Sequence, residues 1–238
     1  MYQMSRKVTY SEAGMNYKTD IAQIINYFQD CSCFQSDSLH VGPRDLENSG
    51  KLWVLNSWQI IVDRYPSYGE DITVGTWAYD FKAMMGMRNF IIDDGKGRRI
   101  AKANSIWAFL DAGKGRLVRP DETMIAAYGT ESRESMDYAP RKIRLEGNFI
   151  KQEAVKVSRS CLDTNHHMNN SRYVAVAMEY LPEDFDIYQL RAEYRKSAVY
   201  GDILIPEVGN NGDKITIILA APDGEPYVIT EFTRRENI

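Results

Sequence analysis

The sequence lacks several features that would define other classes of protein. It has no run of about 18 apolar residues, which a membrane-spanning helix requires. Its first residues lack the apolar segment of a secretory signal peptide, so we expect a cytoplasmic protein. A formal net charge of −4 gives no general case for nucleic-acid binding. The sequence also contains no P-loop and no dinucleotide glycine fingerprint, and we expect no cofactor.

Cysteine and histidine are both scarce, with three residues of each in 238. Cys31 and Cys33 are too close together for a convincing structural disulfide, so we expect all three thiols, including that of Cys161, to be reduced. His166 and His167 are adjacent and diverge, and His40 lies in a separate segment. This spacing does not match a zinc site, and we expect no metal.

A weak internal repeat is the clearest organisational feature of the sequence. In the first half, apolar side chains recur at helical spacing within residues 19–30, and Thr19 stands where a helix cap is expected. In the second half the same spacing fills residues 171–182, where Pro182 is expected to end the helix. Short strands are expected before these helices at residues 7–10 and 154–158. The order of strand and helix therefore occurs twice.

Each predicted helix is followed by strands that begin at a similar corner. Tyr68-Gly69-Glu70 matches Tyr200-Gly201-Asp202, and further strands flank turn signals at Asp94-Gly95 and Asp223-Gly224. One helix beside an antiparallel sheet, occurring twice, predicts an α+β chain of two tandem hotdog units, in which each antiparallel sheet wraps around a long helix. The predicted units are residues 1–130 and 151–238, and a polar linker is expected at residues 131–150.

The most specific pattern lies just before the second predicted helix, where residues 163–173 read DTNHHMNNSRY. Together with WVLNSWQIIVDRYPSYGEDITVGTW, MGMRNFIIDD and LRAEYRKSAVYGD, this segment resembles the acyl-ACP thioesterase family of plants and bacteria. The likeness covers nearly the whole chain, and members of that family carry two hotdog units in one polypeptide. The residues that match the family pattern are Asp163, Asn165, His167, Asn169, Asn170 and Tyr173.

The chemistry of thioester hydrolysis fits this segment. If the segment is extended, Asp163, Asn165 and His167 point to the same side, while His166 points away. The Asn165 amide and the start of the following helix offer donors to a developing oxyanion, and His167 is a natural general base. The resemblance implies that Asn165 and His167 are catalytic and that Asp163 supports them.

One position departs from the family pattern. Family members often have a glutamate, with a neighbouring cysteine in plant members, where this chain has Ser197 and Ala198. A cysteine nucleophile is therefore excluded at that position, and direct attack by water is favoured over a covalent acyl-enzyme. A replacement carboxylate is sought in Glu193 or Glu179.

Several residues have an alternative structural role. Asn170 and Ser171 are expected to serve as helix caps, and the role of Asn169 stays open. Arg88 matches an arginine of the family, and its alternative role is a surface ion pair. Three basic clusters are candidates for docking an acidic carrier protein, or are solvated surface: Arg98, Arg99 and Lys102; Lys114, Arg116 and Arg119; Arg141, Lys142 and Arg144.

The resemblance thus implies a hydrolase of fatty acyl thioesters that acts in fatty acid biosynthesis and lipid metabolism, with acyl-ACP as the expected substrate. Its N-terminal unit is expected to shape the acyl pocket, and its C-terminal unit to be catalytic. A hydroxyacyl-thioester dehydratase and a non-catalytic acyl-thioester binding module are the alternatives. The expected partner is an acyl carrier protein carrying a fatty acyl thioester, and a homodimer is an open alternative to a monomer.

Overall fold

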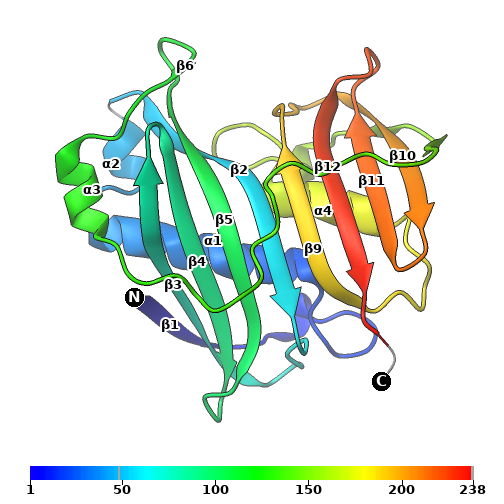
Figure 1. Cartoon of the computed structure of the whole chain (residues 1–238), viewed down its shortest axis with the longest axis horizontal. Helices are drawn as coiled ribbons and strands as arrows, with labels where there is room; N and C mark the ends of the chain where they lie inside the picture. Colours follow the sequence, from blue (N-terminus) through cyan, green and yellow to red (C-terminus); the bar gives the residue numbers. More distant parts are fainter. Residues whose placement is uncertain (48, 237–238) are drawn as a thin grey trace. The chain divides into compact units, whose positions relative to one another are not determined.

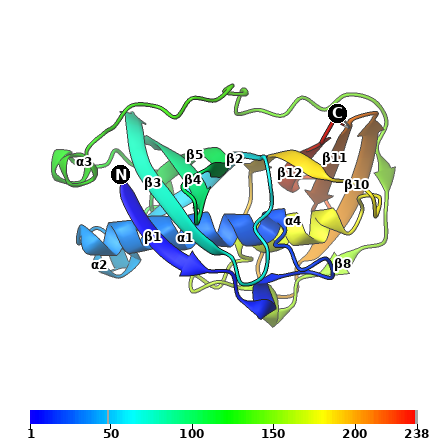
Figure 2. The same cartoon turned by 90° about the horizontal axis from the view of Figure 1, so that it is seen from below.

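The computed structural model describes residues 1–47 and 49–236 of the chain (Figure 1). The chain divides into two units. Unit 1 comprises Met1–Asn56 and Ile60–Tyr138, and unit 2 comprises Ser57–Gln59 and Ala139–Ile238. In each unit one helix lies along a face of an antiparallel sheet (Figure 2). No helix in the described part of the chain is long and apolar enough to cross a membrane.

In unit 1 the antiparallel strands are ordered β1-β3-β4-β5-β2, and β6 pairs with β5. The strands are β1 (Tyr2–Lys7), β2 (Lys51–Val62), β3 (Asp71–Lys82), β4 (Met85–Asp94), β5 (Arg99–Asp111) and β6 (Arg116–Leu117). The helices are η1 (Tyr10–Glu12), α1 (Ile21–Ser38), α2 (Pro43–Glu47) and α3 (Glu122–Tyr128). The predicted strand at residues 7–10 is misplaced, because β1 ends at Lys7 and the chain then turns into η1.

Helix α1 forms the centre of unit 1. Ile24, Ile25 and Phe28 are fully buried, as their helical spacing predicts. The cap is Asp20 and not Thr19, because the Asp20 carboxylate accepts the Gln23 N–H at 2.7 Å. The neighbouring Thr19 is buried, and its own N–H donates to the Pro66 carbonyl at 3.0 Å. The helix also continues well beyond residue 30, to Ser38.

In unit 2 the antiparallel strands are ordered β9-β12-β11-β10-β7, and β8 pairs with β10. The strands are β7 (Ile150–Lys151), β8 (Val155–Lys156), β9 (Ile187–Tyr194), β10 (Ile203–Asn211), β11 (Lys214–Ala220) and β12 (Pro226–Arg234), and the helices are η2 (Arg159–Cys161) and α4 (Asn170–Met178). Helix α4 has only nine residues and ends before Pro182, because the chain leaves it through turns at Tyr180 and Leu181. The strand expected at residues 154–158 is shortened to the two residues of β8.

The internal repeat of the sequence is also present in the backbone. In unit 1 the Val8 N–H donates to Glu70 O at 2.9 Å, and in unit 2 the Val157 N–H donates to Asp202 O at 2.9 Å. Val8 and Val157 are both 1% exposed. The Tyr-Gly-acid corners noted in the sequence are therefore equivalent points of the two units.

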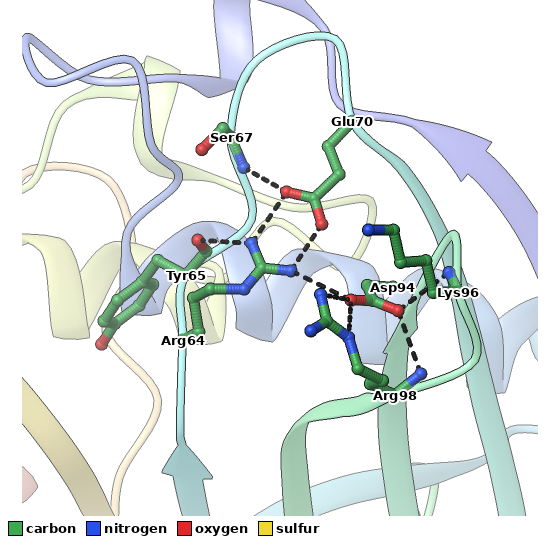
Figure 3. Close-up of polar contacts among 7 residues, drawn as sticks. All are labelled: Arg64, Tyr65, Ser67, Glu70, Asp94, Lys96 and Arg98. Atoms are coloured by element: carbon green, nitrogen blue, oxygen red, sulfur yellow. Dashed lines mark hydrogen bonds and ion pairs between the residues drawn. The ribbon is translucent and has the colours of Figure 1, made fainter.

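The corner of unit 1 is fixed by an ion network (Figure 3). The Glu70 carboxylate accepts the Ser67 N–H at 3.0 Å and binds the Arg64 guanidinium through both oxygens, at 2.6 and 2.9 Å. Arg64 also lies 3.6 Å from Asp94, which pairs with Arg98 at 2.8 Å. These contacts link the β2–β3 corner to the β4–β5 hairpin within the same unit.

Candidate active site

The segment from Asp163 to Asn169 forms a turn and not the extended strand expected from the sequence. Residues 164–166 are in turn and bend conformation, and His166 has a φ of 60°. The Asp163 carboxylate accepts the N–H of Asn165 at 2.8 Å and the N–H of His167 at 3.2 Å through one oxygen. Asp163 therefore closes the turn, as short acidic side chains readily do with the backbone that follows them.

Two polar side chains of the turn make no hydrogen bond within the described part of the chain. Asn165 and His167 are both exposed, and in the described part of the chain neither side chain is hydrogen-bonded. His166 is also exposed, so the strand-like alternation that was expected to turn it away from His167 does not hold in this turn. The backbone at His167 pairs with Val199 in an antiparallel bridge, and the Met168 N–H donates to Ala198 O at 2.8 Å. These bonds fix the position of His167 without using its imidazole.

Helix α4 begins immediately after the turn. Its cap is Asn169, whose side-chain oxygen accepts the Ser171 N–H at 2.9 Å and the Ser171 hydroxyl at 3.0 Å. The expectation that Asn170 and Ser171 are the caps is wrong, because they are already the first residues of the helix. The positive end of the α4 dipole thus follows directly after Asn165 and His167, where it favours negative charge.

The segment of residues 195–199, which follows β9 and pairs with the turn through Val199, is fixed by buried groups. The Tyr173 hydroxyl accepts the Ala198 N–H at 2.7 Å, and Ala198 is fully buried. Burial raises the pKa of Tyr173 to about 12, so this hydroxyl is neutral near pH 7. Ser197 is exposed and occupies the position where the sequence pattern departs from the family.

Neither glutamate considered as a replacement carboxylate lies at this segment. Glu193 is 3% exposed, accepts the Ile143 N–H at 3.1 Å and pairs with Arg195 at 3.2 Å. Glu179 caps the far end of α4, about 13 Å along the helix from its first residue. A carboxylate that does reach the backbone of this segment is Asp202, which accepts the Val199 N–H at 3.0 Å and the Tyr227 hydroxyl at 3.1 Å. The sequence signal that could have identified it is the Tyr-Gly-Asp corner.

Arg88 in unit 1 is buried, so a surface ion pair is the wrong alternative for it. The side chain on β4 donates to Gln35 and, at 3.2 Å, to the Thr76 hydroxyl. Its guanidinium carbon lies 5.3 Å from the centre of the Tyr128 ring. Burial lowers the pKa of Arg88, although neutral hydrogen-bond partners and the aromatic ring support its charge.

Unit 1 contains a loop with the same backbone hydrogen bond and a similar backbone conformation to the turn that Asp163 closes in unit 2. Gly14 N–H donates to Lys18 O at 2.8 Å, as Asp163 N–H donates to His167 O at 2.7 Å. Tyr17 has a φ of 59°, close to the 60° of His166. The two loops differ in how they close: in unit 1 the Asn16 side chain itself accepts the Lys18 N–H, at 3.0 Å.

This difference defines what the turn in unit 2 can do. Asn16 and Asn165 occupy equivalent places, but Asn16 is bonded to its own backbone. In unit 2 Asp163 supplies that acceptor, so the Asn165 amide stays available at the start of α4. An exposed amide, an exposed imidazole and a helix N-terminus together can polarise a carbonyl group and activate water.

No group of three or more metal-binding side chains is assembled in the part of the chain that the structure describes. The cysteines Cys31, Cys33 and Cys161 are unpaired. Burial raises the pKa of the Cys31 thiol to about 12 and that of the Cys33 thiol to about 11, so neither is a ready nucleophile.

Known structures share this double architecture. An acyl-ACP thioesterase from Bacteroides thetaiotaomicron is similar with a TM-score of 0.90 and 19% identity, over 98% of this chain and 97% of that chain. The 12:0-ACP thioesterase from Umbellularia californica is similar with a TM-score of 0.85 and 18% identity, over 99% of this chain and 97% of that chain. These likenesses confirm the predicted α+β fold of two hotdog units.

Sequence comparisons agree with the structural ones. The chloroplastic acyl-carrier-protein hydrolase FATB3 of Cuphea viscosissima is 26% identical over an alignment 258 positions long, which covers 99% of this chain and 59% of that protein. The chain thus spans about three-fifths of the length of that plant relative. The profile of the acyl-ACP thioesterase N-terminal domain matches residues 1–128, and that of the C-terminal domain matches residues 146–223. Together the two family models match most of the chain, in the order of units 1 and 2, so the chain belongs to the acyl-ACP thioesterase family.

Proposed function

We propose that this protein hydrolyses fatty acyl thioesters, with acyl-ACP as its substrate, and releases the free fatty acid. Membership of the thioesterase family and the acyl-ACP hydrolase and thioesterase activities for which the relatives are named support the reaction type. The observation that carries the proposal is the turn of unit 2, which holds Asn165 and His167 at the start of α4 with both side chains unused.

In the proposed reaction, the His167 imidazole takes a proton from water as the water oxygen attacks the thioester carbonyl carbon. Negative charge develops on the carbonyl oxygen, where the Asn165 amide and the N-terminus of α4 stabilise it. A well-placed donor contributes roughly 3 kcal/mol to such a step. The tetrahedral intermediate then expels the thiolate, which receives the proton from the imidazolium, and the fatty acid is released.

Asp163 is assigned a positioning role in this mechanism. Its carboxylate is directed at two backbone N–H groups of the turn, so it orients the catalytic residues and does not contact the reacting atoms. Ser197 and Ala198 offer no thiolate, and the carboxylate hydrogen-bonded to the backbone beside them is that of Asp202. Direct attack by water is therefore the favoured route.

The test is thiol release from an acyl-ACP by wild type and by two histidine variants. His167→Ala is expected to lower kcat by about a hundredfold or more, because general-base catalysis typically contributes that much. His166→Asn is the matched control, since His166 is the adjacent exposed imidazole and asparagine tolerates its positive φ. With a 3-hydroxyacyl-ACP as substrate, loss of water to give an enoyl thioester would identify a dehydratase instead, and binding of either thioester without any product would identify a binding module.

The division of labour is part of the same proposal. Residues 1–130 are proposed to shape the acyl pocket, residues 131–150 to link the units, and residues 151–238 to carry out the chemistry. We also place the protein in the cytoplasm, which the three unpaired cysteines favour, and propose a role in fatty acid biosynthesis. Cell fractionation tests the compartment, and sedimentation tests whether the protein is a homodimer.

A further inference from the structure

Two exposed arginines flank the Asp163 turn within unit 2. Arg159 is the first residue of η2, which leads into the turn, and Arg172 is the third residue of α4, which leaves it. The Arg159 guanidinium lies over the Tyr200 ring, 5.0 Å from its centre. In the described part of the chain neither arginine forms an ion pair, so both charges remain available to a partner.

The position of Arg172 is unfavourable for the helix that carries it. A cation in the first turn of a helix faces the positive end of the helix dipole. The Arg172 side chain is exposed, and no carboxylate of the described chain offsets this cost. A residue that opposes a local rule without compensation within the fold points to a functional role.

The equivalent loop of unit 1 shows that the scaffold itself needs neither cation. Tyr10 occupies the place of Arg159, and its ring packs edge-on against Tyr68, 5.7 Å between centres, as Arg159 packs on Tyr200. Gln23, the third residue of α1, occupies the place of Arg172. Of the two equivalent turns, only the one that carries Asn165 and His167 therefore has arginines at these two positions.

Several members of the first two basic clusters considered from the sequence are already paired within unit 1. Arg98 pairs with Asp94, Arg99 pairs with Asp93 and Glu134, and Lys114 pairs with Asp111.

The cluster at residues 141–144 lies on a different side of unit 2 from α4. It is anchored by Ile143, which packs with Ile218 and Ala220. This segment runs over the face of the unit 2 sheet away from α4 (Figure 2). Arg159 and Arg172 are the exposed guanidinium groups that lie directly before and after the candidate catalytic turn.

We propose that Arg159 and Arg172 form the docking surface for an acidic carrier protein that delivers the acyl thioester to His167. The inference rests on the proposed function and identifies the partner-binding face of the same site. Two unpaired cations complement carboxylates on the partner, while Tyr200, on which Arg159 lies, and the neighbouring Val199 are exposed and offer apolar contact. A chain with a net charge of −4 needs such a local positive surface to attract an acidic partner.

The experiment compares the Arg159→Glu/Arg172→Glu variant with wild type on two substrates with the same acyl chain. One substrate is an acyl-ACP, and the other is the small S-acyl N-acetylcysteamine thioester. On acyl-ACP, kcat/KM is expected to fall by about tenfold or more and to lose its dependence on salt concentration. On the small thioester it is expected to stay within about twofold. Arg172→Glu places an acid at the helix start, so the melting temperature should not decrease.

The matched control is Lys142→Glu/Arg144→Glu, which reverses the same amount of exposed charge in the same unit. It should leave both activities unchanged. Equal losses on the two substrates after changing Arg159 and Arg172 would overturn the docking role, as would full activity on acyl-ACP.

A binding measurement separates docking from catalysis. Calorimetry with holo acyl carrier protein, which bears no acyl group, should show weaker binding to Arg159→Glu/Arg172→Glu than to wild type. Undiminished binding to that variant, or no binding to wild type, overturns the docking surface whether or not thioester is hydrolysed. If wild type binds the carrier but hydrolyses neither thioester, the docking surface stands and the proposed hydrolase activity fails.

Discussion

Replacing Asp163 tests whether its carboxylate acts as a backbone acceptor or as a charge. One oxygen accepts two N–H groups, at 2.8 Å from Asn165 and 3.2 Å from His167. Asp163→Ala removes both hydrogen bonds, each worth about 1 to 1.5 kcal/mol. If this free energy holds Asn165 and His167 in place, the transition state loses about 2 to 3 kcal/mol of stabilisation, because both groups must be positioned together.

That loss corresponds to a fall in kcat/KM of about thirty- to 150-fold. Asp163→Asn keeps a side-chain oxygen at the same place and removes the charge, so its fall should be limited to about fivefold. The assay is the initial rate of thiol release with subsaturating acyl thioester. The small N-acetylcysteamine ester is the preferred substrate, because its turnover does not depend on docking of a carrier protein.

The comparison of the two Asp163 variants is decisive for the role of the side chain. If Asp163→Asn is as inactive as Asp163→Ala, the negative charge and not the acceptor geometry is required, and the positioning role is wrong. If Asp163→Ala retains full activity, the turn holds its shape without the carboxylate. Circular dichroism of both variants checks that the fold is intact, which is expected because the turn lies at the surface.

Two further side chains allow tests of stability. Tyr173→Phe leaves the buried Ala198 N–H without its acceptor at 2.7 Å and should lower the free energy of unfolding in urea by about 1 to 3 kcal/mol, and an unchanged midpoint would contradict this. The backbone N–H and the guanidinium of Arg98 lower the pKa of Asp94 to about 2. The ionised carboxylate therefore stabilises the fold above its ordinary pKa near 4, and this stabilisation is lost as the pH falls toward 2. Asp94→Asn should therefore be less stable than wild type at pH 7, with a difference that narrows between pH 4 and pH 2.5, and a difference independent of pH would refute it.

Much of the fold was predictable because the internal repeat shows in the spacing of apolar side chains along the sequence. Ile24, Ile25 and Phe28 recur at helical spacing, and all three are buried in the structure. The ends of elements were less predictable, because tertiary contacts decide them. Threonine is a residue type that often caps helices. The Thr19 backbone N–H, however, bonds to Pro66 in the corner at residues 66–68, and Asp20 caps the helix instead.

The candidate site was predicted as a set of residues but not as a shape. Its residue types matched the family pattern, while the assumption of an extended segment was wrong at residues 164–166. Alternation along a strand could not account for a turn that Asp163 closes on the N–H of Asn165 and His167. The link between Asp202 and Val199 also depends on the corner fold, and only the structure brings them together.

The two loops indicate which change separates a structural turn from a candidate active one. At Gly14 an added Cβ would meet no atom closer than 3.7 Å, so space does not prevent an acid there. Without that acid, the Asn16 amide must accept the Lys18 N–H, and it cannot also present its oxygen and amide group freely to a ligand. In unit 2 the acceptor is moved two residues earlier, to Asp163, and Asn165 is released. A turn that offers an amide to substrate needs a second acceptor for its own backbone, which gives Asp163 a physical role that requires no contact with the reacting atoms.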